Sequence, residues 1–265
     1  MKEKQLFKGC DIKNLDSYLK QNSNLPGPRA NLSLASCLTD FLLQVEDNLI
    51  DCYLNIVISW CNIPAQKAPT NTPEEYLPFC GFQSLGALFF RVQKPMQDQI
   101  LSLLKKGMND ERWRIKESVA IAFQFIGEKD FTILKENFSR WLPNSNFSEK
   151  RAIIASLAHP PLLKDSYNAN YSLTVSDTIM SSVLRATNIE KKTEGFKVLV
   201  KGLSYALSLF VSSSPNDGFL LLDKFANTKD QIILKIILSN LNKSRIKNKF
   251  PQNVEQFKQK FYERF

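Results

Sequence analysis

Residues 109–127 of the chain are NDERWRIKESVAIAFQFIG, and this stretch decides the fold class. Its apolar residues recur at spacings of three and four, the period of one helix face; they are Ile115, Val119, Ala122, Phe123 and Ile126. Asp110 is suited to cap the start of this helix, and Gly127 is suited to end it. Ile121 and Phe125 fall on the opposite side, so we expect a helix packed between neighbours.

The rest of the chain continues in helices of similar length. Before this stretch, the apolar spacing predicts helices over 11–21 (with Ile12, Leu15 and Leu19 inward), 31–47, 48–62, 73–92 and 95–108. After it, helices are predicted over 130–141, 148–158, 175–187, 193–212, 215–226, 230–241 and 252–265, with a polar connection at 164–172. The β-branched residues of 48–62 leave a strand as the alternative there. The sequence therefore predicts an all-α fold.

Three compact apolar blocks recur along the chain at nearly constant spacing. LGALFF (85–90), VAIAFQF (119–125) and AIIASLA (152–158) lie 34 and then 33 residues apart. Such recurrence is typical of an α-α superhelix, a solenoid built from paired antiparallel helices. We expect residues 1–62 to form an N-terminal helical cap and residues 63–265 to form the repeats with a C-terminal capping helix. Together they would make one continuous domain.

Bulk composition places the chain among ordinary globular proteins. It has 265 residues, of which 43% are hydrophobic and 23% charged. No run approaches the roughly 18 uncharged apolar residues of a membrane span. The N-terminal residues lack the apolar core of a signal peptide. We therefore expect a cytoplasmic protein with no membrane span.

The cysteine and histidine content argues against a metal site. The five cysteines are Cys10, Cys37, Cys52, Cys61 and Cys80, and none form a Cys-x-x-Cys pair. We expect them to be reduced and mostly buried. His159 is the single histidine, so a zinc site or a histidine-based triad is hard to assemble. The sequence also lacks phosphate-binding glycine loops, so no cofactor is expected.

The residues around Asp110 resemble the HEAT repeat. That repeat carries an aspartate in the turn between helices and an apolar–basic pair, here Ile115–Lys116, at the start of the second helix. Three phrases are also similar to uncharacterised bacterial HEAT-repeat proteins; they are LPGPRANLSLA (25–35), ERWRIKESVAIAFQ (111–124) and KGLSYALSLFVSSSPNDG (201–218). The resemblance implies a HEAT- or armadillo-like solenoid. More distant relatives of that fold are the HEAT-like alkylpurine DNA glycosylases.

The first candidate binding site is the start of the central helix, Asp110, Arg112, Trp113, Arg114 and Lys116. If it binds DNA, Trp113 would supply a cation–π face for a damaged base, and the two arginines would contact phosphates. In the structural interpretation Asp110 is a cap, Trp113 fills a gap between repeats, and the arginines bond turn carbonyls. Trp141 and Tyr205 are candidates for a second aromatic. Exposure of Trp113 would favour recognition.

Two further candidates are basic. Lys243, Arg245, Lys247 and Lys249 lie in the last 25 residues, which carry seven basic and two acidic side chains of a chain with net charge +9. They could neutralise phosphates, or form a solvated turn. Lys197 and Lys201, near Tyr205, could line a concave binding face or lie on the outer face.

These observations favour a non-enzymatic repeat protein that binds a macromolecular partner, most simply another protein, through its concave face. The alternative is a protein that binds duplex DNA and is related to the alkylpurine DNA glycosylases; any activity would then be release of alkylated bases. No catalytic residues are predicted in either case.

Overall fold

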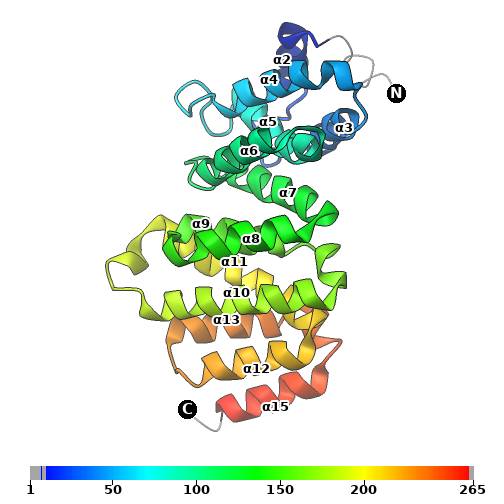
Figure 1. Ribbon diagram of the computed structural model, residues 1–265. Coiled ribbons are helices and arrows are strands. Elements are labelled where there is room, and N and C mark those ends of the chain that lie inside the picture. Colours follow the sequence, from blue (N-terminus) through cyan, green and yellow to red (C-terminus); the bar gives the residue numbers. More distant parts are fainter. Residues whose placement is uncertain (1–6, 8–9, 263–265) are drawn as a thin grey trace. The chain divides into compact units, whose positions relative to one another are not determined.

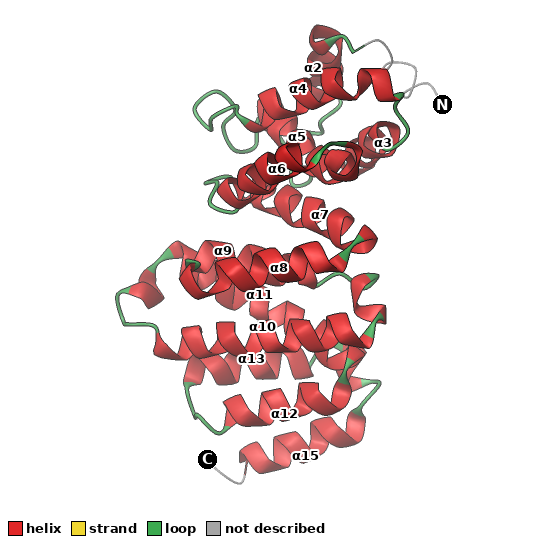
Figure 2. Cartoon of the chain, viewed as in Figure 1, coloured by secondary structure: helices red, strands yellow, loops and turns green. Residues whose placement is uncertain are grey.

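The computed structural model describes residue 7 and residues 10–262. All regular secondary structure in this part of the chain is helical, as the sequence predicts (Figure 2). The chain divides into two compact units, Met1–Lys129 and Asp130–Phe265. The boundary expected at residue 62 does not coincide with this division.

Unit 1 is built around one enclosed helix. Its helices are α2 (Ile12–Gln21), α3 (Leu32–Leu42), α4 (Ile50–Cys61), α5 (Tyr76–Leu88), α6 (Lys94–Gly107) and α7 (Trp113–Lys129) (Figure 1). Every residue of α5 is buried, and α5 packs against α3, α4 and α7. Gly86 permits the approach to α7, because a Cβ there would lie 2.6 Å from the carbonyl oxygen of Ala122. Residues of the expected N-terminal cap thus cover α5.

The stretch 109–127 forms α7 with shifted ends. All five residues of the predicted apolar stripe are fully buried; they are Ile115, Val119, Ala122, Phe123 and Ile126. The helix begins at Trp113, so Asp110 lies before its cap position. Gly127 does not end the helix, which continues to Lys129 until Asp130 takes an extended conformation with φ −151° and caps the next helix. Ile121 and Phe125 are only half-buried, so α7 is not enclosed on every side.

Unit 2 consists of two layers of helices. Its helices are α8 (Phe131–Trp141), α9 (Phe147–Leu157), α10 (Ser166–Arg185), α11 (Glu194–Ser213), α12 (Pro215–Ala226), α13 (Gln231–Leu241), α14 (Ser244–Lys247) and α15 (Pro251–Tyr262). The alternate helices α9, α11 and α13 pack side by side, and α10 and α12 pack against each other and against α11. This alternation is the paired-helix arrangement that the repeated apolar blocks predict within this unit.

Short polar side chains cap seven of the described α-helices. Side-chain caps are formed by Asp11, Asn31, Asp130, Asn146, Asp165, Thr193 and Asp230. Short 3₁₀ segments lie at Asp47–Leu49, Pro73–Glu75, Phe89–Arg91, Leu142–Asn144, Leu162–Lys164 and Glu190–Lys192. These caps explain why most predicted helices begin within one or two residues of the observed ones.

The polar connection expected at 164–172 is wrong, because α10 already begins at Ser166. Asp165 caps it by accepting from the backbone N–H of Tyr167 at 2.8 Å. The hydroxyls that suggested a loop bond back to carbonyls within the helix, as Ser172 does to Asn168 at 2.8 Å. Hydroxyl groups satisfied in this way are tolerated in a helix interior.

Helices α2, α3, α4 and α15 can also be compared with the sequence-based predictions. Ile12 is 40% exposed rather than inward, while Leu15 and Leu19 are buried. Residues 50–61 form helix α4, so the strand alternative is wrong. The helix expected over 31–47 ends at Leu42. The helix expected over 252–265 is α15, in which Val254 and Phe257 are buried; residues 263–265 lie outside the described residues.

A disulfide joins Cys10 to Cys52. The expectation that all five cysteines are reduced thiols is therefore wrong, because the fold brings two cysteines 42 residues apart into bonding distance. Cys37, Cys61 and Cys80 are not disulfide-bonded, and burial raises the pKa of the Cys61 and Cys80 thiols. The bond fastens residue 10 to α4, where the Tyr53 hydroxyl also donates to the carbonyl oxygen of Phe7.

Reduction of this disulfide, or Cys10→Ser, is expected to lower the free energy of unfolding of unit 1 by about 2–4 kcal/mol, because the open chain regains loop entropy. Urea denaturation with and without reductant measures this difference, and Cys37→Ser serves as the control. Alkylation after unfolding without reductant should label the three free cysteines. Labelling of all five would contradict the disulfide.

Helix α11 is the described helix that is long and apolar enough to cross a membrane. It is packed between α9 and α13, with its apolar side buried. Core helices of globular proteins meet the same criteria, so length and composition alone are weak evidence for a span. The absence of a membrane span remains a prediction.

Candidate functional site

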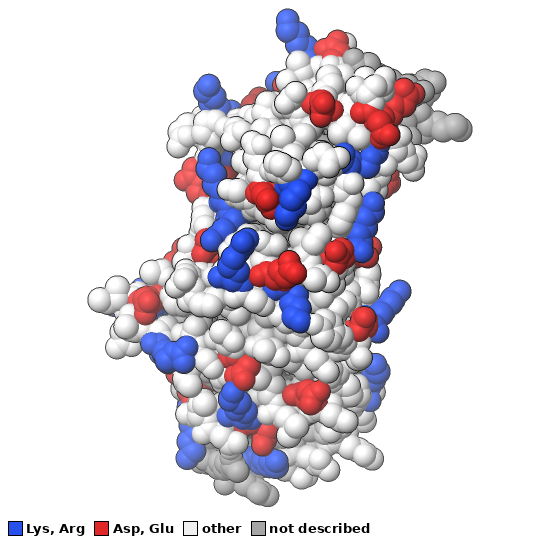
Figure 3. Space-filling model, in the orientation of Figure 1, with Lys and Arg blue, Asp and Glu red and all other residues white. Residues whose placement is uncertain are grey.

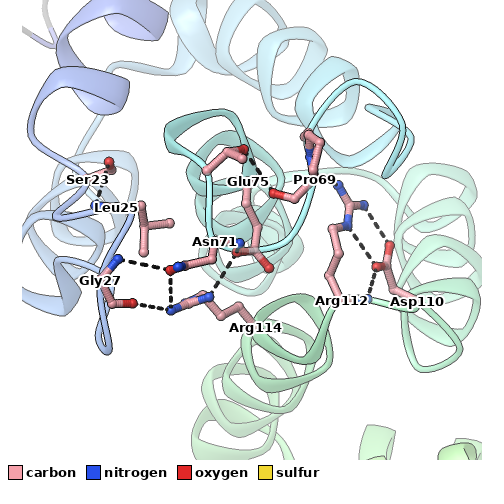
Figure 4. A network of polar contacts seen from close by, with 11 residues as sticks. Ser23, Leu25, Gly27, Pro69, Asn71, Glu75, Asp110, Arg112 and Arg114 are labelled. Carbon is pink, nitrogen blue, oxygen red and sulfur yellow. Dashed lines mark hydrogen bonds and ion pairs between the residues drawn. The ribbon is translucent and has the colours of Figure 1, made fainter.

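The first candidate, at the start of α7, consists largely of buried ion pairs (Figure 4). Asp110 accepts from the backbone N–H of Arg112 at 2.8 Å and from its Nε and Nη2 at 2.8 and 2.7 Å. The guanidinium also donates to the carbonyl oxygens of Ala68 at 3.2 Å and Ile63 at 3.1 Å. Arg112 is only 2% exposed, so it fastens the connector before α5 instead of contacting a ligand.

Arg114 holds two loops of unit 1 together. Its Nη1 lies 3.0 Å from Oε2 of Glu75, and its Nη2 donates to the carbonyl oxygen of Gly27 at 2.8 Å. Asn71 joins them, because its Oδ1 accepts from the Gly27 backbone N–H at 2.9 Å and from Arg114 at 3.3 Å. A Cβ at Gly27 would lie 2.4 Å from the carbonyl oxygen of Asn24, so the loop requires glycine. Two of the phrases that resemble HEAT-repeat proteins thus meet in this network.

The structure agrees fully with neither interpretation of Trp113. The side chain is 52% exposed, so it does not fill a gap between repeats, and its ring lies 4.6 Å from Cζ of Arg114. However, Arg112 and Arg114 are buried and cannot contact phosphates. Lys116 is half-buried, and Asp110 pairs with Arg112 in its place. Trp113 is therefore exposed, but the arginine beside its ring is held in a buried ion pair and does not reach a ligand.

The two basic candidates meet in unit 2 around Tyr205. Lys197, Lys201 and Tyr205 lie on successive turns of the exposed side of α11, and Tyr205 is 50% exposed. Nζ of Lys243 lies 5.6 Å and Cζ of Arg245 lies 4.7 Å from the centroid of the tyrosine ring. Nη2 of Arg245 also donates to the Tyr205 hydroxyl at 3.0 Å. The fold thus supplies the aromatic residue that the basic run lacks in sequence.

The other members of the basic run lie apart from Tyr205. Lys247 and Lys249 are exposed at and beyond the end of α14. Nζ of Lys249 approaches the carbonyl oxygen of Ser212 at 3.4 Å and lies 5.4 Å from the ring centroid of Phe250. Lys247 and Lys249 therefore do not join the cluster around Tyr205.

Contacts between α11 and α13 place another cation on the same side. The hydroxyl of Ser239 donates to the carbonyl oxygen of Ser204 at 3.0 Å, and Lys243 lies against Tyr205 one turn later. Lys243 lies just beyond α13, and Lys249 then reaches Ser212, so the contacts follow the same order along both segments; we infer that α11 and α13 run in the same direction. Lys235, exposed one turn before Ser239, therefore lies beside the turn of α11 that carries Lys201.

On the other side of α11, helix α9 contributes Arg151. A Cβ built on Gly202 would lie 3.5 Å from Cγ of Arg151, which places this arginine against α11. We call the resulting surface the basic face; it consists of Arg151, Lys197, Lys201, Tyr205, Lys235, Lys243 and Arg245. Arg151 and Lys235 are absent from the sequence-based candidates because each is separated from other exposed cations in its helix. Their position opposite the apolar stripe of alternate helices is the signal that could have found them.

Carboxylates are scarce among the helices that form the basic face. Helices α9 and α11 each contain one, Glu149 and Glu194, and α13 contains none. Glu149 already accepts from the backbone N–H of Asn146 at 3.0 Å. Within the described residues, Lys197, Lys201 and Lys235 form no ion pair.

The other layer of unit 2 has balanced charges. Lys224 pairs with Asp177 at 2.6 Å, which joins α12 to α10, and Lys260 pairs with Asp223 at 3.5 Å, which joins α15 to α12. Positive and negative side chains are interspersed where α8, α10, α12 and α15 lie in the view of Figure 3. The excess of positive charge in unit 2 therefore lies on the layer that carries the basic face.

The basic face places several cations and an exposed tyrosine side by side, an arrangement suited to contacting an anionic surface. The described residues contain no cluster of three or more His, Cys, Asp and Glu side chains that could hold a metal ion. Trp141 is buried, so it cannot stack on a base. An exposed tyrosine flanked by cations can instead contribute both apolar area and charge to an interface.

Comparison with protein-family profiles and with curated protein sequences gives no match for this chain. An engineered protein, a target of the Northeast Structural Genomics Consortium, aligns with it over 93% of this chain and 96% of its own. The sequence identity is 12% and the TM-score is 0.37. A likeness this low carries no argument about function, so the proposals below rest on the chain's own residues.

Proposed function

We propose that this helical repeat protein is non-enzymatic and binds an acidic surface of another protein through the basic face of unit 2. The observation that carries the proposal is the meeting of unpaired lysines and an exposed, cation-flanked tyrosine on adjacent parallel helices. Alternate helices of a solenoid line one side of it, and repeat proteins use such sides for binding. The basic face is therefore our candidate for the concave binding surface.

A protein partner fits this face better than duplex DNA. Tyrosine and arginine are the residues that most often anchor protein interfaces, and Arg245 is bonded to Tyr205 in such a position. Leu238, exposed on α13, adds an apolar contact between the cations. The DNA alternative depended on Arg112 and Arg114 as phosphate contacts, and both are buried in unit 1. Alkylpurine glycosylase ancestry is therefore the secondary hypothesis.

We expect Tyr205→Ala combined with Lys201→Gln to weaken the partner complex by about 2 kcal/mol, or roughly thirtyfold, which is typical of losing an interface anchor. Cross-linking in cells followed by mass spectrometry would identify the partner and the residues that contact it. Titration with the purified partner then measures the dissociation constants of the wild-type protein and of the double variant. Lys67→Gln with Lys164→Gln removes two exposed cations elsewhere and serves as the matched control.

Two results would contradict the proposal. One is a partner that cross-links outside the basic face and binds the Tyr205 variant as tightly as the wild type. The other is tight binding of a short duplex DNA that weakens steeply as salt rises and depends on Lys201. The second result would establish the DNA alternative in place of a protein partner.

A further inference from the structure

Unit 2 contains a cleft that is separate from the residues of the basic face. It has a volume of about 460 Å³ and lies where α9 and α11 begin and α10 ends. Its lining includes Phe147, Lys150, Ser182, Arg185, Glu190 and Thr193. The volume is within the range of small-molecule sites in proteins, roughly 300–1,000 Å³.

Two cations line this cleft. Lys150 is only 9% exposed, and its ammonium group donates to the carbonyl oxygen of Ser145. Burial, and to a lesser degree the nearby Arg185, lowers the pKa of Lys150. Within the described residues the guanidinium of Arg185 has no hydrogen-bond or ion-pair partner. A buried lysine beside an exposed arginine thus presents two cationic groups that a bound anion can contact.

Glu190 is the carboxylate that lines the cleft, and with Glu149 it partly offsets the effect of burial on the pKa of Lys150. Glu190 accepts from the backbone N–H of Thr187 at 2.8 Å and from its hydroxyl at 2.9 Å. These bonds hold the pKa of Glu190 below its usual range, so it stays ionised at the rim. Its carboxylate is placed to accept hydrogen bonds from hydroxyl groups of a ligand.

The helix ends add a further positive potential. Asn146 and Thr193 cap α9 and α11, and both line the cleft, so the positive ends of two helix dipoles lie at one place. Phe147 provides an apolar wall, fixed by an edge-to-face contact with Phe196 at 5.2 Å between ring centroids. The cleft therefore combines an anionic-group site, an apolar wall and a hydroxyl acceptor.

We propose that this cleft binds a small hydroxylated organic phosphate, with the phosphate group between Lys150 and Arg185. A phosphomonoester carries up to two negative charges, which matches two cations. Its oxygens can accept from the guanidinium of Arg185 and from the ammonium group of Lys150, which has three N–H donors and gives one to Ser145. The carbon portion packs against Phe147, and its hydroxyl groups donate to Glu190. This site is independent of the proposed protein interface.

The test uses the full chain and glycerol 3-phosphate as the probe, with backbone amide shifts measured by NMR. Saturable shifts are expected at residues 146–150 and 193–196. Arg185→Gln should weaken binding at least about tenfold, because it removes a charge-assisted contact from an exposed side chain that the fold does not need. Arg29→Gln, a matched change of an exposed arginine in unit 1, and Lys201→Gln on the basic face should leave binding unchanged.

Separate titrations with inorganic phosphate and with glycerol measure how much the phosphate group and the hydroxylated carbon portion each contribute to binding. Inorganic phosphate should bind the same residues more weakly than glycerol 3-phosphate, and glycerol should not bind. The proposal is overturned if glycerol 3-phosphate gives no saturable shifts in the cleft. It is also overturned if the Arg185→Gln protein binds it equally well, or if the shifts centre on Lys201. Because Lys201→Gln affects the protein interface alone, failure of one proposal is distinguishable from failure of the other.

Discussion

Arg114→Ala is expected to lower the free energy of unfolding of unit 1 by about 3–5 kcal/mol, because it leaves Glu75 as a buried charge without its partner. Glu75 is fully buried, and Arg114 also bonds the carbonyl oxygen of Gly27. The loss therefore separates the loop at Gly27 and the turn before α5 from α7. Hydrogen exchange of amides in α5 and α7 measures the opening free energy of this unit directly.

The matched control for this prediction is Arg29→Ala, which removes an exposed arginine from the same unit. It should change stability by less than about 0.5 kcal/mol. The double variant Glu75→Ala with Arg114→Ala should lose less than the sum of the single changes, because the two side chains are paired. If the losses are additive, or if Arg114→Ala costs no more than the control, the ion pair does not hold these loops.

Phe123→Ala in α7 is expected to cost about 3–5 kcal/mol, since the ring is fully buried and its removal leaves a cavity. Phe125→Ala, two residues later on the half-buried side of the same helix, should cost only about 1 kcal/mol. Both changes remove the same atoms from the same helix, so helix propensity and side-chain volume are matched. Urea denaturation followed by circular dichroism compares the two variants.

A loss at Phe125→Ala as large as that at Phe123→Ala would mean that both sides of α7 are enclosed. That result would favour the arrangement expected from the sequence over the one in the structure. Comparing the Phe123→Ala and Phe125→Ala variants thus tests the burial of each side of α7. An all-α fold is expected whichever result is found.

The apolar spacing was sufficient to place most helices but not their exact ends. In α7 the buried stripe follows from a period of 3.6 residues, which the chain carries locally. The end at Lys129 depends on Asp130, whose extended backbone begins α8, so Gly127 remains inside the helix. The start of α10 was missed because its serine and threonine hydroxyls resemble loop composition until their bonds to helix carbonyls are seen.

The candidate sites depended more strongly on long-range contacts. Arg112 and Arg114 resemble a phosphate-binding pair in sequence, yet apart from Asp110 their partners lie 39 to 87 residues earlier in the chain. The sequence around the two arginines does not predict these distant partners. Conversely, Lys243 is far from Tyr205 in sequence, and only the packing of α13 and α14 against α11 brings it to the tyrosine ring.

The sequence by itself determined the all-α class and the inward stripe of α7, because both depend on neighbours within about one helical turn. The tertiary structure alone decided four further features. They are the division at Lys129, the Cys10–Cys52 bond, the burial of the two arginines and the assembly of the basic face. These depend on which distant segments pack together, and that is set by side-chain shape and loop closure across the whole unit rather than by any local period.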